Sequence, residues 1–255
     1  MHARLFAFIL FAWASFSALA APTNSLSGAE LQGRALAQKI LAQRPAENFT
    51  NRGTLAIRSD HGQRSAFPVT CETVVTETNW RTQYRARLGA SPAEDTTLVV
   101  THAGEAPNHY WLGEPGEAAL VGAMDFSAGT GVSGNQTLVP FAGSDFWLCD
   151  LGLEFFQWPQ QRVLKREFHR NCACTVLEST NPNPSAKSYS RVVSWIDNDS
   201  LGIVEAYAYD AQGKKLKNFY PKNLEKVNDR YQVESMVMEN LQTGSRSRLD
   251  FDSNP

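Results

Sequence analysis

The chain has 255 residues, of which 42% are apolar and 20% are charged, and its formal net charge is −2 at pH 7. This is the balance of an ordinary globular protein with enough length to bury a sizeable core. The slightly acidic total argues against a nucleic-acid binder, and no cluster of Lys and Arg stands out along the sequence.

Residues 1–20 have the features of a secretory signal peptide. Arg4 gives a positive start, residues 5–16 are mostly apolar, and Ala18-Leu19-Ala20 has the small-x-small pattern that a signal peptidase cleaves. The apolar run is short for a membrane span, so a retained anchor is the less favoured alternative. We therefore expect cleavage after Ala20, export to the periplasm, and a single mature domain over residues 21–255.

The first element of the mature chain is predicted to be a helix over about residues 27–44. Ser27 and Glu30 have the spacing of a capping box, and Pro45 marks the end of the helix. Apolar residues recur at helical spacing and predict a face that packs against a core; they are Leu36, Ala37, Ile40 and Leu41.

From residue 49 onward the apolar period changes from that of a helix to two. Val69, Cys71, Thr73 and Val75, for example, would share one face of a strand. Such alternation is typical of successive antiparallel strands with one buried face. The runs that predict strands are residues 54–58, 69–75, 79–87, 97–102, 162–168, 175–179, 189–197, 203–209, 214–219, 231–241 and 246–251.

Residues 103–135 interrupt the pattern because they are rich in glycine and carry little charge. We expect a short strand around residues 110–112, a short turn of helix around residues 119–121, and a long loop that is a candidate lid over the sheet. Residues 129–134 match Gly-x-Gly-x-x-Gly, but no apolar strand precedes them and no helix can follow, so a dinucleotide site is not expected.

Four cysteines remain in the mature chain, and an exported compartment permits disulfides. Cys172 and Cys174 are too close in sequence to bridge each other comfortably. We therefore expect a disulfide between Cys149 and either Cys172 or Cys174. His169, Cys172 and Cys174 could approach a metal, but their spacing matches no common zinc pattern, so neither a metal nor a cofactor is expected.

Two carboxylates in the aromatic segment 141–158 are the remaining candidates for chemistry. Asp145 and Asp150 could form a catalytic pair, but they are better explained by a short helix that begins at Ser144 or Asp145. A hydrolase or metal enzyme is therefore the least favoured function, and we predict no catalytic residue.

Large apolar side chains are abundant on the predicted strands and in the segment 141–158. Along residues 203–209 the large residues alternate with small ones, which suits a sheet curved around a cavity. Methionine suits a pocket that re-packs around flexible ligands. Each residue alone is more often part of a core, but together they are candidates for lining an apolar cavity: Trp111, Phe146, Trp147, Phe155, Phe156, Trp158, Trp195, Tyr207, Tyr209, Met236 and Met238.

Several short motifs occur in a characteristic order after the helix. They are Gly143-Ser144-Asp145-Phe146 with Asp150-Leu151, then Cys174-Thr175-Val176-Leu177-Glu178-Ser179, residues 189–197, residues 209–217, and Met236-Val237-Met238-Glu239-Asn240 with Thr243-Gly244. In this order the chain resembles the LolA-like outer membrane lipoprotein-sorting protein family. The resemblance implies a mainly β fold of the α+β class, a curved antiparallel half-barrel with helices covering the concave face.

The same resemblance implies a periplasmic role in carrying acylated lipoproteins or related lipids, with transient contact to a membrane complex. We therefore favour a carrier or sensor that binds acyl chains and performs no covalent chemistry. The rival hypothesis is a structural or interaction module with a filled core, which docks an envelope protein through an edge strand or the loop at residues 103–135.

Overall fold

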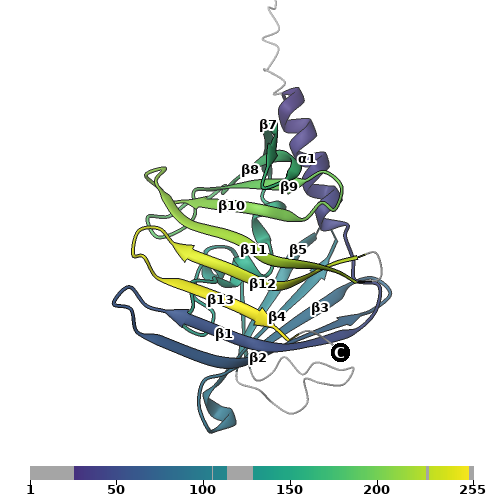
Figure 1. The fold of residues 1–255 in the computed structure, drawn as a ribbon. Helices are drawn as coiled ribbons and strands as arrows, with labels where there is room; N and C mark the ends of the chain where they lie inside the picture. Colours follow the sequence, from purple (N-terminus) through teal and green to yellow (C-terminus); the bar gives the residue numbers. More distant parts are fainter. Residues whose placement is uncertain (1–25, 105, 114–128, 228–229, 253–255) are drawn as a thin grey trace, which may run out of the picture.

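The computed structural model describes residues 26–104, 106–113, 129–227 and 230–252 (Figure 1). The predicted signal peptide lies outside these residues, as does the middle of the predicted glycine-rich lid. What is described of that loop is its two ends, which form strands β5 and β6.

One antiparallel sheet of 13 strands dominates the fold, in the order β6-β5-β4-β3-β2-β1-β13-β12-β11-β10-β9-β8-β7. The sheet is strongly curved (Figure 1), so the prediction of a mainly β, half-barrel fold is confirmed. Its strands are β1 (Phe49–Arg58), β2 (Arg64–Val75), β3 (Trp80–Arg87), β4 (Asp95–Ala103), β5 (Ala106–Gly113), β6 (Gly129–Val132), β7 (Gln160–His169), β8 (Cys172–Thr180), β9 (Arg191–Asp197), β10 (Ile203–Tyr209), β11 (Lys215–Val227), β12 (Arg230–Asn240) and β13 (Arg246–Phe251).

Alternation along the strands determines which side chains face the core. On β1, Leu55 is 1% exposed and pairs with Leu249 of β13, whereas Arg58 on the other face is exposed. Successive side chains of a strand point to opposite faces, so the odd-numbered residues of β1 belong to the concave, buried face. The first and last strands of the described chain pair with each other and join two meanders into one sheet.

Helix α1 (Gly28–Leu41) begins with the predicted capping box between Ser27 and Glu30. It packs against β7, with Ala37 and Ile40 in the core. The approach is close at Gly33, where an added Cβ would lie 2.5 Å from the backbone nitrogen of Arg162. Three short 3-10 helices are also described: η1 (Pro92–Glu94), η4 (Gly134–Thr137) and η5 (Glu154–Gln157).

The covering segment, residues 141–158, connects the two edges of the sheet. β6 and β7 are the outermost strands, so the chain between them must cross from one edge to the other. The crossing carries helix α2 (Leu148–Leu151) and η5. Its side chains enter both halves of the core: Phe141, Phe146, Leu148 and Leu151 pack in one cluster, and Cys149, Phe155 and Phe156 pack in the other.

The helix in the covering segment differs from the prediction. It begins at Leu148 rather than at Ser144 or Asp145. Residues 141–144 instead form a turn, in which the backbone N–H of Ser144 donates to the carbonyl of Phe141. It ends within one turn because Leu153 adopts a left-handed backbone with φ of 50°.

The predicted disulfide is wrong, since Cys71, Cys149, Cys172 and Cys174 are all free. Cys149 is buried in the core cluster that also holds Leu177 of β8. Because faces alternate along β8, Cys172 and Cys174 lie on the face opposite Leu177. The sheet therefore separates Cys149 from both of its expected partners.

Candidate functional site

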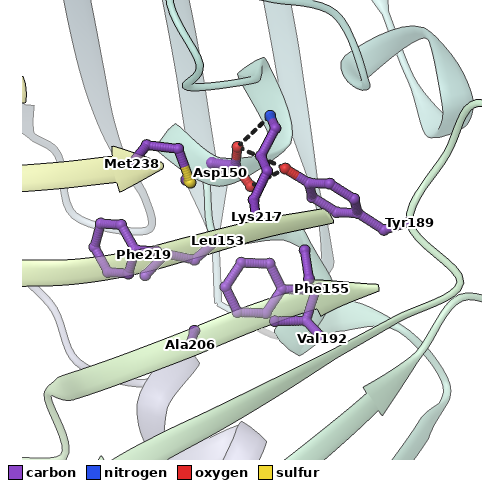
Figure 2. A pocket seen from close by; sticks show the side chains of 10 residues that line it. Asp150, Leu153, Phe155, Tyr189, Val192, Ala206, Lys217, Phe219 and Met238 are labelled. Atoms are coloured by element: carbon purple, nitrogen blue, oxygen red, sulfur yellow. Dashed lines mark hydrogen bonds and ion pairs between the residues drawn. The ribbon is translucent and has the colours of Figure 1, made fainter. Parts of the chain in front are cut away.

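An apolar cavity lies between the covering segment and the strands of the C-terminal half (Figure 2). Its volume is about 20 Å³, which is room for about one water molecule. Figure 2 draws the residues that line it, which are Asp150, Leu153, Phe155, Tyr189, Val192, Ala206, Ala208, Lys217, Phe219 and Met238.

The sheet side of the cavity has small side chains where the covering segment comes closest. Ala206 and Ala208 of β10 face it, and their partners across the sheet are Phe219 and Lys217 of β11. Because these two alanine side chains are small, the bulky Phe155 of the covering segment has room on this side of the cavity. The small face of this strand is therefore the inner one.

Two ionisable groups are buried at one end of the cavity. The Nζ of Lys217 lies 3.6 Å from an Oδ of Asp150, and their side chains are only 2% and 8% exposed. Burial lowers the pKa of Lys217 to about 8, although the Asp150 carboxylate opposes this shift. Burial likewise raises the pKa of Asp150, against the opposing effect of the Lys217 ammonium. The two groups therefore form a buried ion pair between β11 and the covering segment.

Aromatic residues enclose this ion pair. The Tyr189 hydroxyl lies 3.0 and 3.1 Å from the two carboxylate oxygens of Asp150, to which it donates (Figure 2). The Tyr189 ring stacks on Trp147 at 4.5 Å between centroids, and the Lys217 ammonium lies 3.6 Å from the Trp147 ring centroid. A cation against an indole face is stabilised by the ring quadrupole, which offsets part of the cost of burying Lys217.

A second set of polar contacts ties the covering segment to β13 and β11. The Asp145 carboxylate accepts hydrogen bonds from Ser245 at 2.6 Å and from Ser247 at 2.8 Å. The backbone carbonyl of Asp145 accepts from Lys217 Nζ at 2.6 Å. Lys217 thus contacts the covering segment at both Asp145 and Asp150. The two carboxylates stabilise this crossing, and Asp150 also accepts from the backbone N–H of Trp147 at 2.8 Å.

A more polar cavity of about 200 Å³ adjoins the other side of the covering segment. Cys149, Glu154 and Trp158 line it together with residues of η4 and of the loop after β8. Thr137 lies 2.7 Å from both the Gly134 carbonyl and a Glu154 carboxyl oxygen, and burial raises the pKa of Glu154. The hydrogen bond that Thr137 donates to Glu154 opposes this rise in pKa, so burial is the dominant influence on the carboxyl group.

The predicted cavity residues divide into two groups. Phe155 and Met238 line the apolar cavity. Phe146 and Phe156 are buried in the covering segment, Trp147 and Trp158 pack against the second core cluster, and Met236 packs against the first. These residues share the concave face or its cover.

The other predicted residues lie elsewhere. Trp195, Tyr207 and Tyr209 are on the opposite face from Ala206 and Ala208, so they do not line the cavity. Tyr207 and Tyr209 are covered there by Lys215 and Arg191, whose cationic groups lie 3.5 and 4.1 Å from the ring centroids. Trp111 lies on the face of β5 opposite Tyr110, outside the cavity.

The residues considered for metal or acid–base chemistry are used in other ways. His169 Nε2 lies 2.8 Å from Glu205, which also pairs with Arg170 at 2.8 Å, and this cluster is on the outer face. In the described part of the chain, no group of three or more His, Cys, Asp or Glu is arranged to hold a metal ion. No helix within the described ranges is long and apolar enough to cross a membrane.

Solved structures with the same architecture are known. A DUF1329 family protein from Desulfovibrio piger superposes with a TM-score of 0.69 at 18% identity, covering 89% of this chain and 92% of the other. A domain named for outer membrane lipoprotein sorting, from Vibrio parahaemolyticus, gives 0.69 at 19% identity, with 88% and 92% covered. A LolA superfamily protein from Nitrosomonas europaea gives 0.56 at 17% identity, with 89% and 93% covered.

The chain has a LolA-like fold. The resemblance inferred from the sequence motifs is thus confirmed, and at these identities the likeness concerns the fold. A family model described only as an uncharacterized protein matches residues 130–254, which include the covering segment and both partners of the buried ion pair. A comparison with curated proteins gives no match.

Proposed function

We propose that the protein is a periplasmic, non-enzymatic carrier or sensor that binds acyl chains of lipoproteins or lipids between the sheet and the covering segment. The observation that carries the proposal is the apolar cavity on the concave face, with an alanine floor on β10 and a cover made by residues 141–158. Its LolA-like fold supports the assignment, since two similar structures are named for lipoprotein sorting or for LolA.

Binding requires the site to enlarge. A cavity of about 20 Å³ cannot hold an acyl chain, so the described conformation corresponds to a closed state. The flexible side chain of Met238 lines the cavity and is suited to re-packing around a ligand. Each methylene transferred from water contributes about 0.8 kcal/mol, so a chain of about ten methylenes could offset the loss of several contacts of the cover.

The polar contacts of the cover give the closed state a defined geometry. Lys217, Asp150 and Tyr189 meet only when the covering segment lies on the sheet, because they come from β11, α2 and the loop before β9. In this proposal the apolar cavity supplies affinity for the acyl chain. The buried polar groups determine the position to which the covering segment returns after the acyl chain is released.

A fluorescent fatty-acid probe tests the proposal. We expect the purified protein to bind the probe, and Ala206→Leu and Ala208→Leu to weaken binding because they fill the floor of the cavity. Ala211→Leu, the same change in the exposed β10–β11 turn, is the control and should bind as the parent does. Folding of each variant is checked by circular dichroism. Equal binding by all three variants would contradict the proposed site.

A second candidate is an envelope interaction module with a filled core. The small volume of the cavity and the many contacts of the covering segment favour this alternative. It predicts no binding of the probe at any concentration that leaves the protein folded, together with co-purification of a stable protein partner. The probe experiment therefore separates the two candidates.

A further inference from the structure

Four arginines from three adjacent strands gather on the outer face of the sheet. Arg58 of β1 is directly opposite Arg64 of β2 on one side and Arg246 of β13 on the other. Arg248 lies two residues further along β13, opposite Ala56. Together they line a shallow groove, which we call the arginine patch: Arg58, Arg64, Arg246 and Arg248. Sequence inspection could not find it because the four positions come from distant segments.

The positive charge of the arginine patch is only partly compensated. Arg246 lies 3.5 Å from Glu239 and Arg248 lies 2.6 Å from Asp250. Arg58 donates to the carbonyl of Gly244 at 3.2 Å. Among the described residues, neither Arg58 nor Arg64 has a carboxylate partner. Like charges directly opposite each other destabilise a sheet, so an external anion would relieve this repulsion.

The surroundings of the patch restrict which partner it fits. β1, β2 and β13 are each paired on both sides, so a peptide cannot add to them as a further strand. Recognition must therefore rely on side chains. Guanidinium groups bind phosphate oxygens in a bidentate manner, and neighbouring strands space these groups about 4.8 Å apart across the surface.

Two hairpin turns flank the patch. The β1–β2 and β12–β13 turns project on the same side of the molecule (left in Figure 1), and the Arg58–Gly244 contact links them. The β12–β13 turn carries Leu241, which is 45% exposed. Leu241 lies at the end of this turn nearest β11, where its backbone N–H donates to the carbonyl of Leu216. A cluster of guanidinium groups on an exposed sheet face, flanked by a turn with an exposed apolar side chain, is suited to the interface of a bilayer, where headgroup phosphates lie next to the hydrocarbon.

We infer that the arginine patch docks the protein on an anionic phospholipid surface through the headgroup phosphates. The contact uses the outer face, opposite the face on which the covering segment lies. Docking at the membrane and occupation of the concave cavity are therefore structurally independent. Acyl-probe binding should be the same in patch variants and in the parent protein.

Sedimentation with lipid vesicles tests this inference. The purified protein should bind vesicles that contain phosphatidylglycerol but not vesicles of phosphatidylcholine alone, and salt should weaken the binding. Arg58→Gln combined with Arg64→Gln should weaken it about 25-fold, at about fivefold for each arginine. Arg34→Gln combined with Lys39→Gln removes the same charge from the exposed side of α1 and should leave binding unchanged.

Three results would overturn the inference. They are equal binding to both kinds of vesicle, an equal loss in the α1 control, and retention of the protein on polyglutamate without binding to either vesicle. The patch variant should also unfold at the same or a higher urea concentration than the parent, because it removes repulsion between like charges. A loss of vesicle binding that follows from unfolding would thereby be recognised.

Discussion

The ammonium of Lys217 lies 3.6 Å from the carboxylate of Asp150 in the interior of the protein, where strand β11 meets the covering segment. Burying two charges costs several kcal/mol each, and their attraction compensates only when the geometry is good and the remaining groups are hydrogen-bonded. Here Tyr189, the Trp147 backbone N–H and the Asp145 carbonyl supply those hydrogen bonds. The pair therefore favours one position of the covering segment, and its contribution depends on these hydrogen bonds being complete.

Replacing Lys217 by Met should destabilise the protein at neutral pH by about 3–5 kcal/mol, because it leaves Asp150 buried without a cation. The free energy of unfolding is measured by urea denaturation. Adding Asp150→Asn to Lys217→Met should recover much of the loss, since no uncompensated charge then remains. The loss of unfolding free energy is also measured for Asp150→Asn alone. If the loss in the double variant equals the sum of the losses in the two single variants, the two residues are not coupled.

The pair also predicts how stability depends on pH in the alkaline range. Burial lowers the pKa of Lys217 to about 8 from 10.5, so between these values the unfolded chain binds more protons than the folded one. The contribution of Lys217 to the free energy of unfolding must therefore rise with pH above about 8.

Other groups titrate in the same range, so the comparison needs a reference. Burial raises the pKa of the Cys71 and Cys149 thiols, which gives the opposite slope above the ordinary cysteine value of 9.0. The Lys217→Met/Asp150→Asn variant keeps both cysteines. From pH 8 to 9 the parent should gain stability relative to this variant. A constant difference over that range would mean that Lys217 keeps its ordinary pKa.

The contact between α1 and β7 predicts a contrast between two glycines of one helix. A Cβ at Gly33 would lie 2.5 Å from the backbone of β7, which has no flexible atom to move aside. Gly33→Ala should therefore cost about 1–3 kcal/mol through displacement of the helix. Gly28→Ala, with nothing within 4 Å, should be neutral or slightly stabilising. Thermal unfolding of the two variants gives the comparison, and equal melting temperatures would contradict the observed packing.

Much of the fold could be predicted from local pattern. The Ser27–Glu30 capping box identifies the start of α1, and alternation at Leu55 and Val69 identifies the strands of the concave face. Strand β6 was missed because its sequence, Gly-Thr-Gly-Val, has neither large side chains nor alternation, and its formation depends on pairing with β5.

The site was harder to predict because its burial is set by contacts between distant segments. Lys217 lies in a run of lysines that is typical of an exposed strand, and only the covering segment makes it interior. Tyr207 and Tyr209 seemed suited to a cavity wall by size, but the inner face of β10 must be small because Phe155 occupies the space above it. The aromatic rings face outward, where Lys215 and Arg191 cover them.

Mass spectrometry of the protein released from its own cells under native conditions shows directly whether the concave face holds acyl chains. We expect bound lipid in the parent protein, recovered in the organic extract, and less of it in Ala206→Leu and Ala208→Leu. Protein that carries no lipid when freshly isolated, and that binds no acyl chain when one is supplied, would contradict it.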